Sequence, residues 1–212
     1  MSKQKNTLAR SKKNERFKIH KTLGNENTEK EPTLEVFRIS QDEKAGVLFT
    51  QKHQRVEAHY CSETEISSYV VCNADFEDDS CVLCDIGKRK IVLLLFPIYS
   101  FDSGAIEVLS VTNSLRPDAL LPQIQNVLDS DKMRVTFFSR DNHKFNISVN
   151  KLSKEKRKMI GETIRTFTKS WESKEIDLST VYKRLTNKTL SKCSEITQKL
   201  ALKGLVASTD GK

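Results

Sequence analysis

Four of the five cysteines of this chain lie close together in the sequence, and a histidine stands just before the first of them. In a chain without a secretory signature, such clustering is typical of a metal site rather than of disulfides. Cys81 and Cys84 are separated by two residues, a spacing at which both thiolates can turn towards one Zn²⁺ at about 2.3 Å. Cys72 lies upstream as a third soft ligand, and either His59 or Cys61 can complete a tetrahedral set. The sequence therefore predicts one structural zinc ion.

Two other interpretations of these cysteines are open at this point: a redox pair, or buried thiols without a ligand. A redox Cys-x2-Cys pair is expected within a βαβ pattern of the thioredoxin kind, which the surrounding sequence lacks. A catalytic zinc of the deaminase kind requires a His-x-Glu signature, which the chain also lacks. The intervening segment 73–80 is acidic and holds no further cysteine or histidine. A metal would hold this loop, which is too short to be ordered by packing alone.

The residues between 33 and 150 have the alternating, β-branched character of short strands. The most apolar stretch, 90–100, predicts a central strand, and a turn at 102–104 predicts a hairpin with 105–111. A helix is expected over 117–128, where apolar residues recur at helical spacing. The other expected strands cover residues 33–40, 45–50 (with 55–61 as an extension), 67–72, 132–138 and 144–149. Five or six strands with one short helix predict a small barrel rather than a parallel sheet.

The two ends of the chain differ from this middle part. Residues 1–32 have few apolar side chains and no sustained period, so we expect a flexible basic arm there. From Ile160 onwards, apolar residues recur at helical spacing in lysine-rich sequence, which predicts two or three amphipathic helices. These would pack on the barrel or on a partner. The predicted organisation is an arm over 1–32, a core over 33–150 with a zinc subdomain at 59–84, and a helical extension over 151–212.

The charge follows the same division. The chain has a formal net charge of +8, but residues 31–150 carry −6 while residues 1–30 carry +6 and residues 151–212 carry +8. Basic flanks around a folded module favour a polyanionic partner, nucleic acid first, although solvated ends are the plainer alternative. No apolar run approaches the roughly 18 residues of a membrane span, and the N-terminus lacks the apolar segment of a signal peptide. We therefore expect a cytoplasmic protein, neither secreted nor membrane-bound.

The cysteine-rich segment resembles the zinc subdomain of the single-stranded-DNA-binding proteins of T-even and related phages. That family's pattern is a His, twelve residues, a Cys, eight or nine residues and then Cys-x2-Cys, with an aromatic and β-branched strand before the first Cys. The ligands that fit this spacing are His59, Cys72, Cys81 and Cys84. The resemblance covers residues 33–150 by organisation and 59–84 by specific residues. It favours His59 over Cys61 as the fourth ligand.

The resemblance also implies a fold and a function. The implied fold class is mainly β with appended helices: an OB-fold-like small barrel with a zinc knuckle, followed by a C-terminal helical region. The implied function is to bind and coat single-stranded DNA, independently of sequence, in replication, recombination and repair. If the chain is phage-encoded, its place is the host cytoplasm.

A short basic motif near the N-terminus is similar to the one by which those proteins bind their neighbours along the strand. The residues expected to mediate this self-association are Lys3, Lys5, Arg10, Lys12 and Lys13. The other end of the chain departs from the family, whose members carry a long acidic tail that recruits replication enzymes. Residues 151–212 are instead basic and helical. Replication or recombination proteins are therefore expected partners without an assigned surface.

A single strand is held by a basic groove that follows its phosphates and by aromatic rings that stack on its bases. The expected DNA-binding residues are Lys88, Arg89, Lys90, Tyr99, Phe101, Arg134, Phe138, Arg140 and Lys144. Tyr99 and Phe101 flank a hairpin turn, which favours stacking. Because adjacent residues of a strand face opposite sides, one of Phe137 and Phe138 belongs to the core and the other is available to stack. The run 88–90 is alternatively a solvated edge that deters strand pairing.

The sequence offers little for catalysis. It contains no P-loop, no dinucleotide-binding glycine pattern and no Gly-x-Ser-x-Gly elbow, so we expect no enzyme. Two hypotheses from different classes follow. The first is a zinc-containing protein that coats single-stranded DNA. The second is a scaffold of a nucleoprotein complex, or an RNA-binding subunit, that docks through its basic helices; stacking and phosphate contacts suit RNA as well as DNA.

Overall fold

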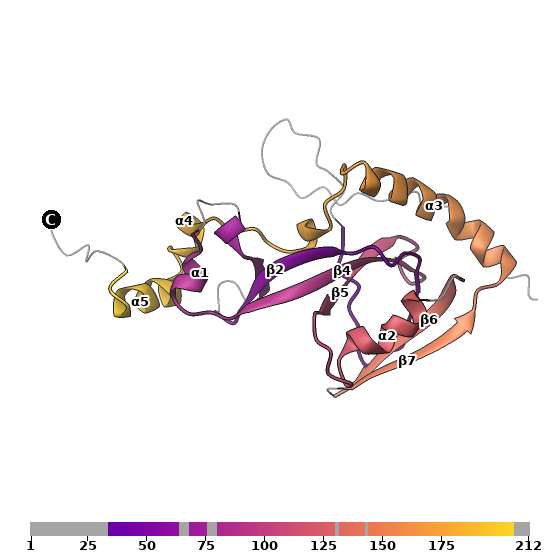
Figure 1. The fold of residues 1–212 in the computed structure, drawn as a ribbon, viewed down its shortest axis with the longest axis horizontal. Coiled ribbons are helices and arrows are strands. Elements are labelled where there is room, and N and C mark those ends of the chain that lie inside the picture. The colour runs from indigo at the N-terminus through magenta and orange to yellow at the C-terminus, as the bar shows by residue number, and fades with distance from the viewer. Residues whose placement is uncertain (1–33, 64–67, 76–79, 130–131, 143, 206–212) are drawn as a thin grey trace, which may run out of the picture. The chain divides into compact units, whose positions relative to one another are not determined.

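The computed structural model describes residues 34–63, 68–75, 80–129, 132–142 and 144–205 (Figure 1). The expected arm at 1–32 lies outside the described residues. In the described part of the chain, seven strands form one antiparallel sheet. They are β1 (Lys44–Leu48), β2 (Gln54–Cys61), β3 (Ser68–Val71), β4 (Lys90–Ser100), β5 (Ile106–Thr112), β6 (Arg134–Asp141) and β7 (Lys144–Lys151). The expectation of a mainly β fold with appended helices is confirmed.

Strand β4 is the centre of the sheet, as its apolar sequence predicts. One of its edges pairs with β5, from Leu93 opposite Thr112 to Tyr99 opposite Ile106. Its other edge is shared, because β2 pairs with residues 90–95 and β1 with residues 98–100. Strand β3 extends the sheet from β2, and β6 and β7 extend it from β1. One edge of β4 is therefore shared by two groups of strands, β2 with β3 and β1 with β6 and β7.

Pro97 lies in β4 at the point where this shared edge changes partner. Its neighbour in β5 is Val108, whose N–H and C=O are bonded to Glu35 and Phe37 on the far side. Val108 and Pro97 thus form a non-hydrogen-bonded pair, and Pro97 turns its nitrogen towards the other edge of β4. That edge has no paired partner between residues 95 and 98. A proline is therefore accommodated in a central strand because no ladder bond is lost.

The strand expected over 33–40 is not formed in the described residues 34–40. This segment makes a single parallel bridge, between Val36 and Val108 of β5. Further along, the carbonyl of Ser40 accepts a hydrogen bond from Arg140 N–H of β6 at 2.7 Å. The segment crosses from one strand to another instead of following either, so it makes too few consecutive bonds to be a strand.

The closed barrel expected from the strand count is not observed, because the seven-stranded sheet is open. The expected continuation of 45–50 into 55–61 is also absent, since β1 and β2 are separate strands that pair with different parts of β4. Sequence patterns identified most of the strands but could not show which edges remain unpaired.

One apolar core lies between the sheet and helix α2 (Leu120–Leu128). Leu120, Leu121, Ile124 and Leu128 of this helix are all buried, at the spacing that predicts it. Their partners alternate along the strands and include Leu48, Leu94, Phe96, Ile98 and Phe138, with Phe37 from the crossing segment. Helix α2 begins at Leu120, three residues later than the expected start.

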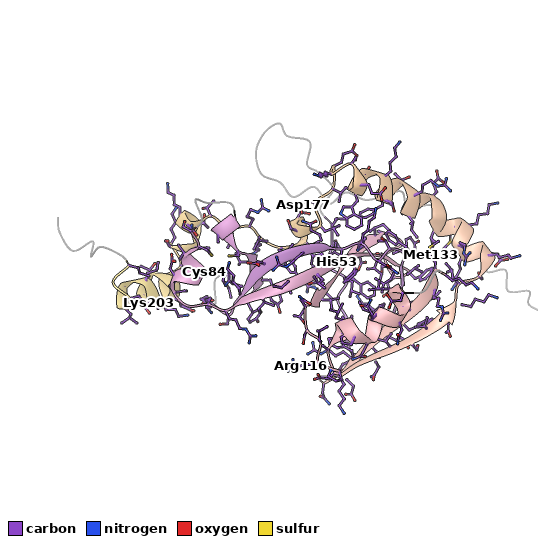
Figure 2. All side chains as sticks on the ribbon, in the orientation of Figure 1. His53, Cys84, Arg116, Met133, Asp177 and Lys203 are labelled. Carbon is purple, nitrogen blue, oxygen red and sulfur yellow. The ribbon has the colours of Figure 1, made fainter. Side chains whose placement is uncertain are left out.

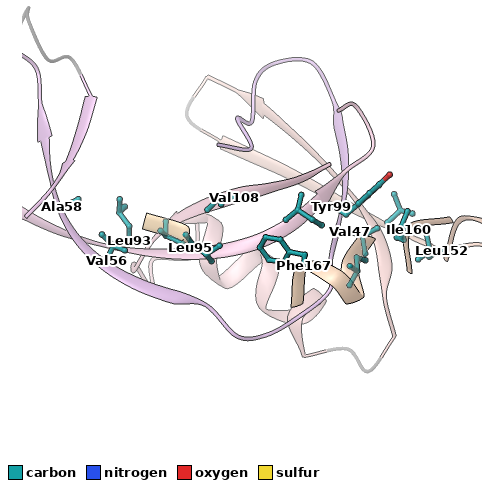
Figure 3. Packing of buried hydrophobic residues seen from close by; sticks show 14 of the residues in the cluster. Val47, Val56, Ala58, Leu93, Leu95, Tyr99, Val108, Leu152, Ile160 and Phe167 are labelled. Carbon is teal, nitrogen blue, oxygen red and sulfur yellow. The ribbon is translucent and has the colours of Figure 1, made fainter. Parts of the chain in front are cut away.

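A second core covers the opposite face of the sheet, where helix α3 (Lys154–Glu172) packs (Figure 3). Ile160, Ile164 and Phe167 of α3 are buried against strand residues such as Val47 and Leu95. Helix α3 begins where the Ser153 hydroxyl accepts a hydrogen bond from Lys156 N–H. The expected amphipathic helix thus packs on its own chain.

The rest of the C-terminal region is less regular than the helices expected from its periodicity. Residues Leu178–Val181 form one 3₁₀ turn, η2, because Asp177 caps it and Tyr182 returns to extended backbone. Two short helices follow, α4 (Asn187–Leu190) and α5 (Ser194–Leu202). Thr186 caps α4 by accepting a hydrogen bond from Thr189 N–H. The apolar spacing therefore located part of the buried set, such as Leu178, Leu190 and Leu200, but overestimated the helical length, and Leu202 and Leu205 are exposed.

Candidate metal centre

The two candidate fourth ligands lie on the same face of β2. Side chains alternate along a strand, so His59 and Cys61 point to one side of the sheet, and Ala58 and Tyr60 point to the other. His59 is fully buried, opposite Val70 of β3. Strand β3 ends just before Cys72, whose N–H donates to the carbonyl of Glu57 at 2.8 Å. The β2–β3 hairpin therefore carries two of the predicted ligands on its buried face.

The other two ligands flank a single helical turn, α1 (Val82–Asp85). Cys81 is its N-cap, and the turn ends at Gly87, whose positive φ of 82° suits glycine. The N–H of Lys88 bonds to the carbonyl of Leu83, and the N–H of Gly87 bonds to that of Cys84, both at 2.8 Å. This is the Schellman pattern of helix ends. It closes the knuckle that presents both cysteine sulfurs to one point.

The four side chains meet at distances suited to a tetrahedral ion. His59 Nε2 lies 3.6 Å from Cys81 Sγ and 3.5 Å from Cys84 Sγ, and Cys72 Sγ lies 3.8 Å from Cys84 Sγ. All four ligand atoms lie within 4.8 Å of one another. For metal–sulfur bonds of about 2.3 Å and metal–nitrogen bonds of about 2.0–2.1 Å, tetrahedral geometry predicts about 3.8 Å between two sulfurs and about 3.6 Å between sulfur and nitrogen. The three closest of these distances match the tetrahedral values, so the cluster can hold a metal ion.

Cys61 does not belong to this group of ligand atoms. It is fully buried in the apolar cluster that also contains Cys193 and Leu200. Burial, together with the nearby Glu63 carboxylate, raises the pKa of Cys61 to about 11 and so favours the neutral thiol. Both residues share one face of β2, but only His59 reaches the knuckle. All five cysteines are free thiols, so no disulfide competes for the ligands.

The surroundings of the three cysteine ligands differ. Burial would raise the pKa of Cys81, but hydrogen bonds with His59 and with the backbone of Asn73, Cys84 and Leu83 lower it to about 6. Burial and the neighbouring thiols raise the pKa of Cys84 to about 12, and burial also raises that of Cys72. One thiolate is thus favoured by the fold itself. Three adjacent thiolates would need a bound cation to coexist.

The C-terminal helices cover the metal cluster. Leu190 of α4 and Ile196 and Leu200 of α5 are buried against Cys72, Cys81 and Leu83. Asn187 connects the two parts: its Oδ1 accepts from Val82 N–H at 3.1 Å, and its Nδ2 donates to Ser80 Oγ at 3.0 Å. Lys203, labelled with Cys84 in Figure 2, donates to the carbonyl of Asp85. The candidate centre therefore joins a hairpin, a knuckle and two helices more than 100 residues later.

The basic run after the knuckle is largely engaged in ion pairs. Lys88 Nζ lies 2.8 Å from Oε1 of Glu63, whose side chain is fully buried. Lys90 Nζ lies 3.1 Å from Oε2 of Glu57. Arg89 is exposed. Lys88 therefore contributes to the packing of the metal subdomain rather than to an open groove.

Two of the aromatic residues expected to stack on bases are buried. Phe138 has no exposed surface and lies edge-on against Phe37, with ring centroids 5.3 Å apart. Tyr99 is 7% exposed and packs against Phe101. Phe101 is half-buried, with Lys156 Nζ 5.1 Å from its ring centroid. The structure thus makes Phe138, not Phe137, the core member of its pair, and neither Phe138 nor Tyr99 is available to a base.

The predicted cations of the last hairpin are exposed. Arg134 lies at the start of β6, while Arg140 and Lys144 lie beside the turn between β6 and β7. The Arg140 guanidinium lies 5.4 Å from the ring centroid of Phe145 and donates to the carbonyl of Asn142. These residues stand at opposite ends of the hairpin, so they do not form one compact patch. The arm residues Lys3, Lys5, Arg10, Lys12 and Lys13 lie outside the described residues.

The most exposed aromatic side chain of the described residues is Tyr60, which is 50% exposed. It is an aromatic candidate from the sequence, but Tyr99 and Phe101 rank ahead of it there because they flank a turn. Its ring centroid lies 5.3 Å from that of Tyr69, its partner across β2 and β3. Tyr69 in turn lies 5.6 Å from Tyr182, in the segment after η2. Strand alternation indicates that Tyr60 faces away from the buried ligand His59, but Ala58 shares the face of Tyr60 and is buried, so alternation alone does not give the exposure.

Comparison with known protein families, with curated proteins and with solved structures found no match to this chain. No helix in the described part of the chain combines the length and the apolarity that a membrane crossing requires.

Proposed function

We propose that this protein binds single-stranded DNA independently of sequence and that a single structural zinc ion holds its metal subdomain together. The observation that carries the proposal is the row of three tyrosines on β2, β3 and the segment after η2. Tyr60 at its outer end is half exposed, Tyr69 supports it, and the hydroxyl of Tyr182 is hydrogen-bonded to Ser110 at the inner end. A supported, exposed ring is the platform on which an unpaired base stacks.

Zinc is the metal that best suits the cluster. Three cysteine sulfurs and one imidazole nitrogen form a soft donor set of the Cys₃His kind, which favours Zn²⁺ over Mg²⁺ or Ca²⁺. Four protein ligands leave no position for a substrate or a water, so the ion has a structural rather than a catalytic role. The ligand set is also the one implied by the resemblance to the phage single-stranded-DNA-binding proteins.

The same resemblance supports an OB-like arrangement of the core. The crossing segment 34–40 is bonded to β5 through Val108 and to β6 through Arg140, so it spans the interval between these two strands. An OB-like core is a partly open barrel in which such an interval is expected. Strands β5 and β6 are not paired with each other. We propose that segment 34–40 closes the interval between them in place of direct strand pairing.

Exposed cations supply the electrostatic part of the proposed binding. The outer face of α3 carries exposed lysines and arginines at positions 154, 156, 157, 158, 165 and 169. Arg134, Arg140 and Lys144 are exposed on the β6–β7 hairpin. Each phosphate that these side chains neutralise releases condensed counterions and makes binding dependent on salt.

The packing of the helices disfavours the scaffold alternative. The apolar face of α3 is buried in the core of its own sheet, and that of α5 is buried against the metal cluster. The large apolar side chains that these two helices leave exposed are single residues, Met159 of α3 and Leu202 of α5, rather than a continuous docking face. RNA remains the alternative ligand, because a stacking platform and phosphate contacts suit both nucleic acids.

The biological setting follows from the proposed activity. A protein that coats single strands acts in DNA replication, recombination and repair, in the cytoplasm of a host if the protein is phage-encoded. Self-association along the strand through the N-terminal arm, and contacts with replication or recombination proteins, are part of this proposal.

The test is the binding of a fluorescent oligo-dT, with duplex DNA and a matched RNA as competitors, in a salt series. We expect a strong preference for the single strand and a log–log salt slope of about −0.7 for each phosphate contacted. Tyr60→Ala should weaken binding by about 1–3 kcal/mol, whereas the matched control Tyr60→Phe, which keeps the ring, should bind like the wild type. Equal affinity for duplex and single strand, or equal affinity of the Ala and Phe variants, would contradict the proposal.

A further inference from the structure

The start of β6, the end of β7 and the first turn of α3 enclose a hollow of ≈ 360 Å³. Four of its seven lining residues are cations, Lys132, Arg134, Lys151 and Arg157, and none of the seven is acidic. The aliphatic part of its wall includes Met133, labelled in Figure 2. Cations from separate parts of the chain therefore converge on one concave site.

The strand register brings two of these cations face to face. Arg134 of β6 is paired directly with Lys151 of β7. Side chains of directly paired residues project from the same face of the sheet with their Cβ atoms about 4.5–5.5 Å apart, and like charges in this position repel. An anion bound between the two side chains would relieve this repulsion, so the Arg134–Lys151 pair points to an anion site.

Helix α3 adds a second unfavourable arrangement at the same place. Acidic side chains are favoured in the first turn of a helix, because the helix dipole is positive there. The first five residues of α3 are Lys154, Glu155, Lys156, Arg157 and Lys158, four of them cationic. Arg157 faces the hollow. The dipole and the side chains thus both make the potential at the start of α3 positive.

No carboxylate within the described residues forms an ion pair with Arg134, Lys151 or Arg157. These three residues differ in this respect from Lys88, Lys90 and Lys199, which all pair with glutamates.

We propose that this hollow, the β6–β7–α3 pocket, binds a phosphate group that carries two negative charges. Two guanidinium groups can each donate a pair of parallel hydrogen bonds to phosphate oxygens, and the lysine ammonium groups add point charges. Free inorganic phosphate and the terminal phosphate of a nucleic-acid strand share this chemistry. The proposal does not depend on the tyrosine platform, since it requires only the cations of the pocket.

The test is a calorimetric titration of the full-length protein with inorganic phosphate, at an ionic strength held constant with chloride. The pocket variant is Arg134→Gln with Lys151→Gln. The control is Arg116→Gln with Lys188→Gln, which removes the same charge from exposed positions outside the pocket, in the segment before α2 and in α4. We expect saturable binding by the wild type and the control, and affinity weakened by about tenfold or more for each cation lost from the pocket.

Thermal unfolding provides a second readout that does not depend on calorimetric heats. Phosphate should raise the Tm of the wild type and of the control, because a ligand that binds only the folded state stabilises it, and should leave the Tm of the pocket variant unchanged. In chloride alone the pocket variant should be at least as stable as the wild type, since its repulsion is relieved. Wild-type protein that shows no saturable phosphate binding, or a control that loses as much affinity as the pocket variant, would overturn the proposal.

The source of the phosphate is distinguished with oligo-dT that carries either a 5′-phosphate or a 5′-hydroxyl. If strand ends occupy the pocket, the phosphorylated strand should bind more tightly, and the advantage should disappear in the pocket variant. If free phosphate occupies it, the two strands should bind equally while inorganic phosphate still titrates the site. If the tyrosine platform does not bind DNA, the 5′-hydroxyl strand will bind weakly in chloride. The calorimetric titration with inorganic phosphate does not depend on that outcome.

Discussion

The carboxylate of Glu63 lies 2.8 Å from the ammonium of Lys199, although the two residues are 136 positions apart. The same carboxylate oxygen lies 2.8 Å from Lys88, and the Glu63 side chain has no exposed surface. This buried acid therefore ties helix α5 to the strand that carries His59 and to the knuckle that carries Cys84.

Glu63→Gln should destabilise the folded protein by about 2 kcal/mol in chemical denaturation. Removing one partner of a buried pair costs about 3–5 kcal/mol, and the partial exposure of both lysines reduces this value. The control Glu172→Gln removes an exposed pair with Lys52 and should cost less than about 1 kcal/mol. Equal losses in the two variants would show that burial is not what makes Glu63 important.

The same residue predicts a pH dependence. Burial would raise the pKa of Glu63, but hydrogen bonds from Lys199 and Lys88 lower it to about 2, from an ordinary 4.5. A group with a depressed folded pKa stabilises the protein above its unfolded pKa, and this contribution is lost as the pH falls from about 4.5 towards 2. The stability difference between wild type and Glu63→Gln should therefore shrink over this window when unfolding is followed by circular dichroism.

Metal analysis of purified protein should find one zinc ion per chain, and chelation should lower the Tm. Cys81→Ser, Cys84→Ser and His59→Ala each remove a ligand and should weaken zinc binding by about tenfold or more. Cys61→Ala is the control, because Cys61 lies outside the group of ligand atoms. Zinc lost from Cys61→Ala but retained by His59→Ala would reverse the assignment of the fourth ligand.

Asn187 should be important for the stability of the knuckle without touching the metal. Asn187→Ala removes hydrogen bonds to Val82 N–H and to Ser80, so the partly buried N–H at the start of α1 loses this acceptor. The expected loss is about 1–3 kcal/mol, with faster release of zinc to a chelator. Asn146→Ala, at an exposed position of β7, is the matched control and should change neither quantity. If Asn187→Ala released zinc at the wild-type rate, α4 would not contribute to the stability of the metal centre.

Substitution by alanine should have opposite effects on stability at two glycines, Gly46 and Gly161. A Cβ on Gly46 of β1 would lie 2.6 Å from Cδ1 of Ile98 and 3.1 Å from the Tyr99 carbonyl oxygen, so Gly46→Ala should cost about 1–3 kcal/mol. Gly161 of α3 has open space at this position, and Gly161→Ala should stabilise the helix by about 0.8–1.0 kcal/mol. Thermal melts of both variants test the close packing of β1 on β4.

Local patterns were sufficient for the elements whose structure depends on nearby residues. The apolar run 90–100 is β4, with the expected bounds, and the apolar spacing from Ile160 to Phe167 marks the buried face of α3. The spacing of the cysteines limited the metal ligands to one triad and two candidates for the fourth position. These signals are local because alternation, helical period and the two-residue knuckle are properties of a few consecutive residues.

The tertiary structure decided what local alternation leaves open. His59 and Cys61 share one face of β2, so only the position of the knuckle selects His59. Segment 34–40 has a strand-like sequence, but its hydrogen bonds go to two different strands. Phe138 is core because α2 covers its face of β6. Alternation shows which side chains share a face, whereas long-range contacts decide whether that face meets a helix, a metal ligand or water.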